Sequence, residues 1–212
     1  MKNILCFGDS NTWGYVPDVR TRYSEKERWP RLMASALGED YYVIEEGLNG
    51  RTTAFSDCLE PYRNALDYIA PCILTHAPLD FIIIMLGTND TKIRYQVCAD
   101  EITTGMKNLV KKLLFYYPTE KYPVLPEILI AAPGPLIPNK EHTSFDSSSA
   151  EKLRELPSKY EALAKELGCL YFNTQTVLTE KELGGDGIHL TKEGHSKLAK
   201  AFTSIIQDHF KG

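Results

Sequence analysis

The feature that most constrains the fold of this chain is a run of six consecutive apolar residues at positions 81–86, FIIIML. A strand with one face in water alternates apolar and polar residues, so an unbroken apolar run indicates a strand that is covered on both faces. Shorter strand-like runs recur at 4–7, 42–46, 128–132 and 170–173. Such strands are typical of parallel sheets that lie between two layers of helices.

Helical patterns separate these runs. A helix is predicted to begin near Pro30, since proline is tolerated in a first turn, and to end at Gly38. In 101–117, seven apolar residues share one face at 3.6-residue spacing, and a similar stripe in 192–210 follows Thr191, a suitable cap. Helical spacing also occurs in 153–167, where Pro157 is expected to kink or break the helix. Segments 15–28 and 137–149 are expected to be irregular.

Alternating strands and helices predict an α/β fold, a three-layer α/β/α domain on a flavodoxin-like five-stranded parallel sheet. With 212 residues and 43% hydrophobic composition, the chain is expected to form a single domain over 1–212.

Composition excludes several functional classes. The net charge is −4, with basic and acidic residues interleaved, so no nucleic-acid partner is expected. No apolar stretch is long enough for a signal sequence or a membrane span, which predicts a cytoplasmic protein without a membrane partner. The five cysteines are scattered and never spaced C-x-x-C, so neither disulfides nor a zinc site is predicted, and most are expected in the core.

Polar residues follow four of the predicted strand regions. The sequences are Gly8-Asp9-Ser10-Asn11, Gly47-Leu48-Asn49-Gly50-Arg51, Gly87-Thr88-Asn89-Asp90 and Gly184-Gly185-Asp186-Gly187-Ile188-His189. In a doubly wound sheet, ligands bind beyond the carboxyl ends of the strands, where these segments are expected to meet.

These residue types suit acyl transfer. A serine hydroxyl becomes a nucleophile when a histidine takes its proton and a carboxylate orients that histidine, which predicts Ser10, His189 and Asp186 as the catalytic residues. The Ser10 and Gly50 backbone N–H groups and the Asn89 amide are candidate oxyanion donors. No metal or organic cofactor is required.

Each assignment has a structural alternative. The loop containing Ser10 suits turns and helix caps, His189 would suit a solvent-exposed helix start, Asn89 could cap a helix and Gly50 could serve turn geometry. Asp9 is assigned no catalytic role.

Two other functional classes also fit parts of the pattern. A flavodoxin-like module would bind a phosphate or nucleotide at the loop containing Ser10. A metal-dependent phosphoesterase would use Asp9, Asp90, Asn89 and His189 as ligands, although a paired Asp-x-His or His-x-x-x-His set is missing.

The four segments resemble the blocks of the SGNH (GDSL-type) serine hydrolases, in order and approximate spacing. The resemblance implies the SGNH hydrolase fold, a Ser10 nucleophile, a His189–Asp186 base pair and an oxyanion hole of Ser10, Gly50 and Asn89. Longer strings, FGDSNTWG at 7–14, EEGLNGRTT at 45–53 and IIMLGTNDTK at 83–92, resemble the aryl esterase and acyltransferase branch.

The branch usually has leucine after the nucleophile, where this chain has Asn11. The predicted pocket residues are Asn11, Trp13, Lys92 and Ile188, and the predicted substrate is a small-molecule, short-chain (acetyl-type) ester, with acyl transfer to alcohols as a further reaction. The resemblance also implies association into a homo-oligomer.

Overall fold

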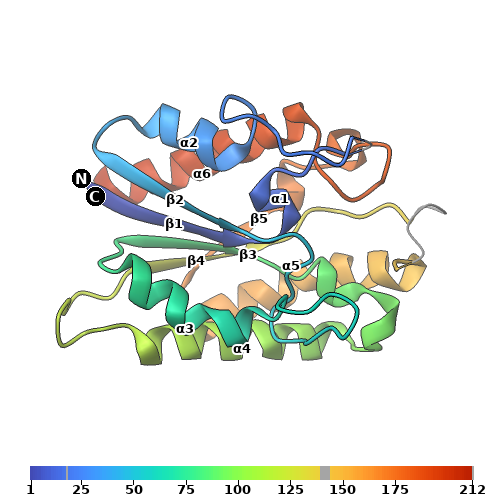
Figure 1. Ribbon diagram of the computed structural model, residues 1–212, viewed down its shortest axis with the longest axis horizontal. Coiled ribbons are helices and arrows are strands. Elements are labelled where there is room, and N and C mark those ends of the chain that lie inside the picture. Colours follow the sequence, from blue (N-terminus) through green and yellow to red (C-terminus); the bar gives the residue numbers. More distant parts are fainter. Residues whose placement is uncertain (18, 139–143, 212) are drawn as a thin grey trace.

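In a computed structural model of the chain, which describes residues 1–17, 19–138 and 144–211, five strands form one sheet between two helical layers (Figure 1). All neighbouring strands are parallel, in the order β2-β1-β3-β4-β5. The strands are β1 (Lys2–Gly8), β2 (Tyr41–Gly47), β3 (Phe81–Met85), β4 (Glu127–Ala132) and β5 (Leu170–Asn173). The predicted three-layer α/β/α fold with a flavodoxin-like sheet is confirmed.

Helices cover both faces of the sheet. As Figure 1 shows, α2 (Trp29–Leu37) and α6 (Lys192–Lys211) lie on one side, and α3 (Ala65–His76), α4 (Ala99–Tyr116) and α5 (Ser147–Leu167) lie on the other. A helix of four residues, α1 (Ser10–Trp13), follows β1 directly. Single 3-10 turns span Asn89–Thr91, Ile93–Tyr95, Thr174–Thr176 and Glu180–Glu182.

Alternate residues of the central strand β3 supply the two cores. Ile82 and Ile84 pack with α3, α4 and α5, while Phe81, Ile83 and Met85 pack with α2 and α6. All five side chains are buried. Burying a side chain of this size stabilises a fold by about 1.5–3 kcal/mol. Because β3 places such side chains on both faces of the sheet, it stabilises the packing of both helical layers.

Charged side chains of the edge strand β2 also alternate between the two faces of the sheet. Glu45 faces the α2 side and accepts a hydrogen bond from Arg28 Nε at 2.6 Å. The next residue, Glu46, faces the α3 side, where its Oε1 lies 2.8 Å from His76 Nε2. The polar end of β2 is therefore tied to helices on both faces.

Two helical predictions need correction. Helix α5 begins at Ser147, inside the segment expected to be irregular, because the Asp146 side chain caps it by accepting from Ser148 N at 2.9 Å. Of the kink or break expected at Pro157, the break is wrong, since α5 continues to Leu167. Its buried stripe extends across the proline, and this packing offsets the missing backbone hydrogen bond.

Helix α3 was not predicted. Its buried residues Ala65, Ile69, Cys72 and Ile73 have helical spacing, but Pro71 interrupts the pattern in the sequence. The prediction that most cysteines lie in the core is also wrong, because only Cys6 and Cys72 are buried; all five are free thiols.

None of the helices in the described ranges is long and apolar enough to cross a membrane.

His195 of α6 is fully buried, although no sequence pattern marks it as special. Its Nδ1 accepts a hydrogen bond from Trp29 N at 3.3 Å, and the Tyr23 ring meets it edge-on at 5.0 Å. Burial, together with the smaller effect of the His189 charge, lowers the pKa of His195 from 6.5 to about 3. The ring is therefore held neutral.

The buried ring predicts a pH-dependent stability term. Between about pH 6.5 and 3, the unfolded chain binds a proton at His195 that the folded chain does not, so the free energy of unfolding falls as pH falls. Relative to His195→Leu, wild type should lose about 1.4 kcal/mol per pH unit in this range. Urea unfolding at a series of pH values measures both proteins.

The comparison between variants matters because two other groups act in the opposite direction. Burial raises the pKa of Asp9 and of Asp90 to about 6, so their protonation favours the folded state on acidification. Both carboxyls are present in wild type and variant and cancel in the difference. Parallel stability curves for the two proteins would contradict a neutral His195.

Candidate active site

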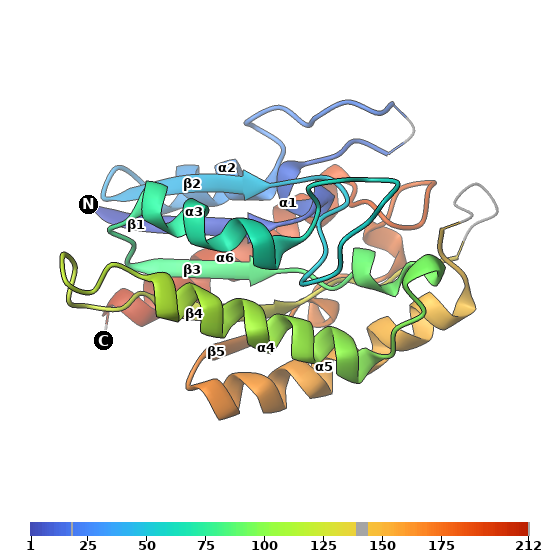
Figure 2. The same ribbon diagram turned by 60° about the horizontal axis from the view of Figure 1, so that its bottom comes forward.

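Strand β1 passes into α1 at the carboxyl edge of the sheet (Figure 2), and the nucleophile candidate, Ser10, is the first residue of α1. Asp9 caps this helix by accepting from Asn11 N at 2.9 Å, and its carbonyl accepts from Trp13 N at 2.9 Å. Gly47, at the end of β2, allows the close approach of α1, since a Cβ there would lie 2.2 Å from Trp13 N. The position of Ser10 is therefore fixed by two adjacent strand ends.

The structure brings His189 and Asp186 to Ser10. The His189 Nε2 atom lies 2.9 Å from Ser10 Oγ, and its Nδ1 atom lies 2.7 Å from Asp186 Oδ2. The other carboxylate oxygen, Asp186 Oδ1, accepts from the backbone N–H groups of Ile188 and His189, both at 2.9 Å. Both oxygens of Asp186 are thus engaged by residues of its own turn.

This arrangement selects one histidine tautomer. An ionised carboxylate only accepts, so Nδ1 of His189 carries the proton and Nε2 is free to accept the Ser10 hydroxyl proton. Burial alone would raise the pKa of Asp186, but hydrogen bonds from His189 and the backbone outweigh it, and the pKa is lowered. Asp186 therefore remains a carboxylate beside the imidazole.

The three predicted oxyanion donors lie around the same serine. Gly50 has a φ of +79°, a left-handed conformation that favours glycine. In the described part of the chain, the backbone N–H groups of Ser10 and Gly50 have no protein acceptor. The Asn89 amide donates to the Arg51 carbonyl at 3.1 Å, and its Nδ2 also lies 3.5 Å from Asp9 Oδ2.

Arg51 is a supporting residue that the sequence analysis quoted without assigning a role. Its Nη1 donates to the carbonyl of Gly8 at 2.9 Å and to that of Glu46, and its guanidinium lies 4.2 Å from the Phe7 ring centroid. The buried side chain joins the ends of β1 and β2, while its own carbonyl orients Asn89.

The buried carboxyl groups of Asp9 and Asp90 lie next to the site and help to hold its loops in place. The pKa of Asp90 is raised to about 6 by burial, even though its Oδ1 accepts from the Thr53 backbone and hydroxyl. Burial similarly raises the pKa of Asp9 to about 6, and the Asp9 side chain caps α1. Both carboxyl groups thus hydrogen-bond to protein groups and help to position the loops.

A cavity opens over these residues. Its lining includes the predicted Ser10, Gly50, Asn89, Lys92, Ile188 and His189, and six residues that the sequence analysis did not select: Tyr15, Asn49, Glu60, Arg94, Ser144 and Phe145. Tyr15 lies against the base, with ring centroids 4.2 Å apart. The missed residues come mainly from irregular segments, where no periodic pattern reveals which side chains face inward.

One wall of the cavity is a chain of alternating charges. Glu60 lies between Lys92 and Arg94, with Oε2 2.9 Å from Arg94 Nη2. Arg94 also binds Asp57, whose pKa is lowered to about 2 because hydrogen bonds from Leu59 N, Arg94 and Tyr95 outweigh its burial. Asp57 is buried behind the cavity lining, and with its carboxylate the cluster of two cations and two carboxylates has no net charge.

Two residues predicted in the pocket do not line this cavity. Trp13 lies at the end of α1, where its ring contacts Tyr15 and Arg22. Asn11 instead joins two loops: its Nδ2 donates to the Ile188 carbonyl at 3.3 Å, and its Oδ1 accepts from Leu190 N at 3.0 Å. These bonds hold the residues on either side of His189.

The site geometry also bears on the metal-dependent alternative. Both ring nitrogens of His189 face Asp186 and Ser10, and Asp90 Oδ1 is engaged by Thr53. Among the described residues, Asp9, Asp90 and His189 do not form a group whose ligand atoms could hold one metal ion. The geometry around Ser10 is instead the one that activation of a serine hydroxyl requires.

The comparisons with known proteins identify the family. The model of the GDSL-like lipase/acylhydrolase family matches residues 6–197, and the chain belongs to this family. The membership places it among carboxylic ester hydrolases and does not favour a nucleotide-binding module or a phosphoesterase.

Solved structures extend this finding over the whole chain. The aryl esterase of M. smegmatis is 36% identical, with 98% of this chain and 99% of that chain covered and a TM-score of 0.92. A carbohydrate acetylesterase from Sinorhizobium meliloti gives the same identity, coverage and TM-score. An acetylxylan esterase of Xylanibacter ruminicola is 24% identical over 96% of this chain, which spans only 43% of that relative's length.

The two hydrogen bonds of Asn11 predict the effect of restoring the leucine usual in the branch. Asn11→Leu leaves the Leu190 N–H and the Ile188 carbonyl without their partner, which should cost about 1–3 kcal/mol in the free energy of unfolding. Hydrogen exchange at Leu190 should accelerate.

Asn11→Asp is the comparison variant, because it keeps the acceptor for Leu190 N while a carboxylate oxygen replaces the amide donor. Its exchange at Leu190 should stay close to wild type. If Asn11→Leu exchanged as slowly as wild type, the side chain would not be holding the His189 loop.

Proposed function

We propose that this chain is a serine esterase that cleaves acetyl-type carboxylic esters through an acyl-enzyme on Ser10. The observation that carries the proposal is the continuous hydrogen-bonded series from Asp186 through His189 to Ser10, at 2.7 and 2.9 Å. A serine in this arrangement is equipped to attack a carbonyl.

In the first half of the reaction, Ser10 Oγ attacks the ester carbonyl carbon while His189 Nε2 takes the hydroxyl proton. The carbonyl electron pair moves to oxygen, where the N–H groups of Ser10 and Gly50 and the Asn89 amide stabilise the negative charge. The intermediate then collapses: the bond to the alcohol oxygen breaks, His189 gives its proton to that oxygen, and the acyl group stays on Ser10.

In the second half, a water molecule attacks the acyl carbon and passes its proton to His189 Nε2. The bond to Ser10 Oγ breaks, His189 returns the proton to the serine, and the carboxylic acid leaves. An alcohol in place of the water would complete an acyl transfer. Asp186 keeps its charge throughout and stabilises the imidazolium.

The cavity supports a small, uncharged polar substrate. Ile188, Phe145 and Tyr15 supply apolar surface beside Ser10, while the wall of Lys92, Glu60 and the neighbouring charges has no net charge. The names of two similar proteins, a carbohydrate acetylesterase and an acetylxylan esterase, favour acetyl esters, and a third is an aryl esterase. The proposed reaction needs no metal or organic cofactor. Homo-oligomerisation and a cytoplasmic location stay predictions.

Substitutions in the site should distinguish the role of the nucleophile from the role of an oxyanion donor. Ser10→Ala should lower kcat for p-nitrophenyl acetate by about 10⁴-fold or more. Asn89→Ala should lower kcat by about 10²–10³-fold, the usual effect of losing one oxyanion donor. Steady-state rates, with unfolding midpoints measured alongside, test both.

Ser204→Ala, an exposed serine-to-alanine change on α6, is the matched control and should retain wild-type kinetics. A correctly folded Ser10→Ala protein that hydrolyses the ester at the wild-type rate would refute the assignment. Equal losses in the control would show that the assay reports stability instead of chemistry.

A further inference from the structure

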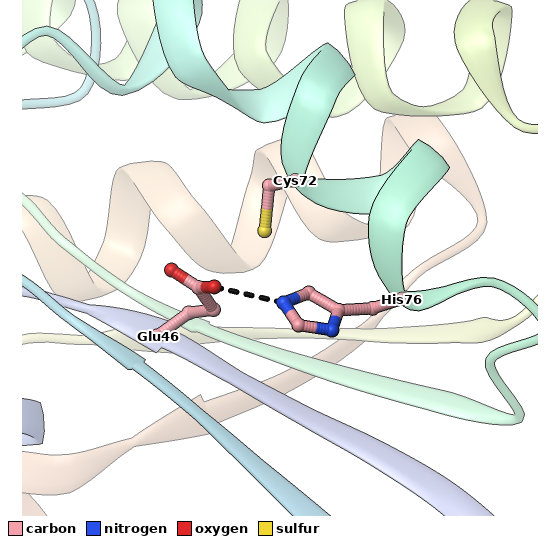
Figure 3. Close-up of side chains that lie close together, drawn as sticks. All are labelled: Glu46, Cys72 and His76. Atoms are coloured by element: carbon pink, nitrogen blue, oxygen red, sulfur yellow. Dashed lines mark hydrogen bonds and ion pairs between the residues drawn. The ribbon is translucent and has the colours of Figure 1, made fainter.

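A second cluster of reactive side chains lies on the α3 face of the sheet. Glu46 on β2 and Cys72 and His76 on α3 point toward one another, as Figure 3 shows. One ligand atom from each, a carboxylate oxygen, the thiol sulfur and a ring nitrogen, lies within 4.8 Å of the others. The two helix residues are four apart, so they share one face of α3.

The cluster is closed on one side and accessible on the other. Cys72 is buried, whereas the side chains of Glu46 and His76 are 18% and 24% exposed. The Glu46 Oε1 atom lies 2.8 Å from His76 Nε2 and accepts from the Tyr68 hydroxyl at 3.3 Å. An ion from solvent would meet the carboxylate and the imidazole first and the sulfur last.

We propose that Glu46, Cys72 and His76 bind a divalent cation of the zinc class. Zinc accepts this mixture of oxygen, sulfur and nitrogen ligands at about 2.0–2.3 Å, so the ligand atoms need to lie roughly 3.5 Å apart. Closing the present spread requires about 1 Å of side-chain movement, which the partly exposed Glu46 and His76 permit. Three protein ligands leave a fourth position for a water molecule.

The neighbouring cation Arg51 forms an ion pair with the Glu46 carboxylate but does not hydrogen-bond to it. Its Nη2 lies 3.9 Å from Glu46 Oε2, outside hydrogen-bond distance. The guanidinium is held instead by the carbonyls of Gly8 and Glu46 and by the Phe7 ring. No hydrogen bond from Arg51 therefore competes with a metal ion for the Glu46 carboxylate.

Binding requires the Cys72 thiolate. Burial, together with the negative charge of Glu46, raises the pKa of Cys72 to about 12, while Arg51 lowers it. The metal-free residue is a thiol at neutral pH, so Zn²⁺ would form the sulfur bond by releasing the thiol proton to solvent. About one proton per bound ion is expected, and affinity should rise with pH.

Cobalt(II) titration of the EDTA-treated full-length protein tests the site. One Co²⁺ per chain should bind with a sulfur-to-metal charge-transfer absorption, and Zn²⁺ should displace it. Cys72→Ser should abolish this absorption and weaken Zn²⁺ binding, measured against a chromogenic chelator, by more than about 100-fold, above the 10–100-fold typical of losing an outer contact.

Cys98→Ser is the matched control, since Cys98 is exposed and outside the cluster. It should bind as wild type does, whereas His76→Gln, at a partly exposed position, should weaken binding without unfolding the protein. Wild-type protein with no thiolate absorption, or a Cys72→Ser protein with unchanged zinc affinity, would show that His76 and Glu46 form an ion pair only. The result is independent of the esterase proposal, because Ser10→Ala leaves the cluster intact.

Discussion

The candidate site depends on one hydrogen bond, between His189 Nε2 and Ser10 Oγ, which are 2.9 Å apart and 179 positions apart in the sequence. Such a contact forms only if the loop after β1 and the segment before α6 reach the same edge of the sheet. The parallel order β2-β1-β3-β4-β5 provides this, since every strand delivers its carboxyl end there. Asn11 then joins the two segments through its bond to Leu190 N, and Gly47 allows α1 to approach the end of β2.

Three buried aspartates beside Ser10 show how the local environment shifts the pKa values of similar groups in opposite directions. Asp186 receives hydrogen bonds on both oxygens and its pKa is lowered, so it is suited to stabilise a cationic imidazole. Asp9 and Asp90 are buried more completely, and their pKa values are raised to about 6. In the proposed mechanism, the first supplies charge, and the other two shape the loops that carry Ser10 and Asn89.

Sequence reasoning brought together Ser10, Asp186 and His189 because strand ends and turn glycines are readable from local patterns. The buried apolar runs predicted a parallel sheet covered on both faces, and the strand order was that of the flavodoxin-like fold class. By contrast, Tyr15 and Phe145 face the cavity from segments without periodicity, and α3 was obscured by Pro71. Asn11 shows a further limit of sequence reasoning. Its position beside the nucleophile suggested a pocket residue, but its hydrogen-bond partners lie 177 and 179 positions away, and it joins two loops.

The most direct test of the account is labelling with a fluorophosphonate, followed by peptide mapping of the adduct. The native protein should acquire one phosphonyl group, on Ser10, and heat-denatured protein should acquire none. An adduct on any other residue, or labelling that survives denaturation, would contradict an activated Ser10.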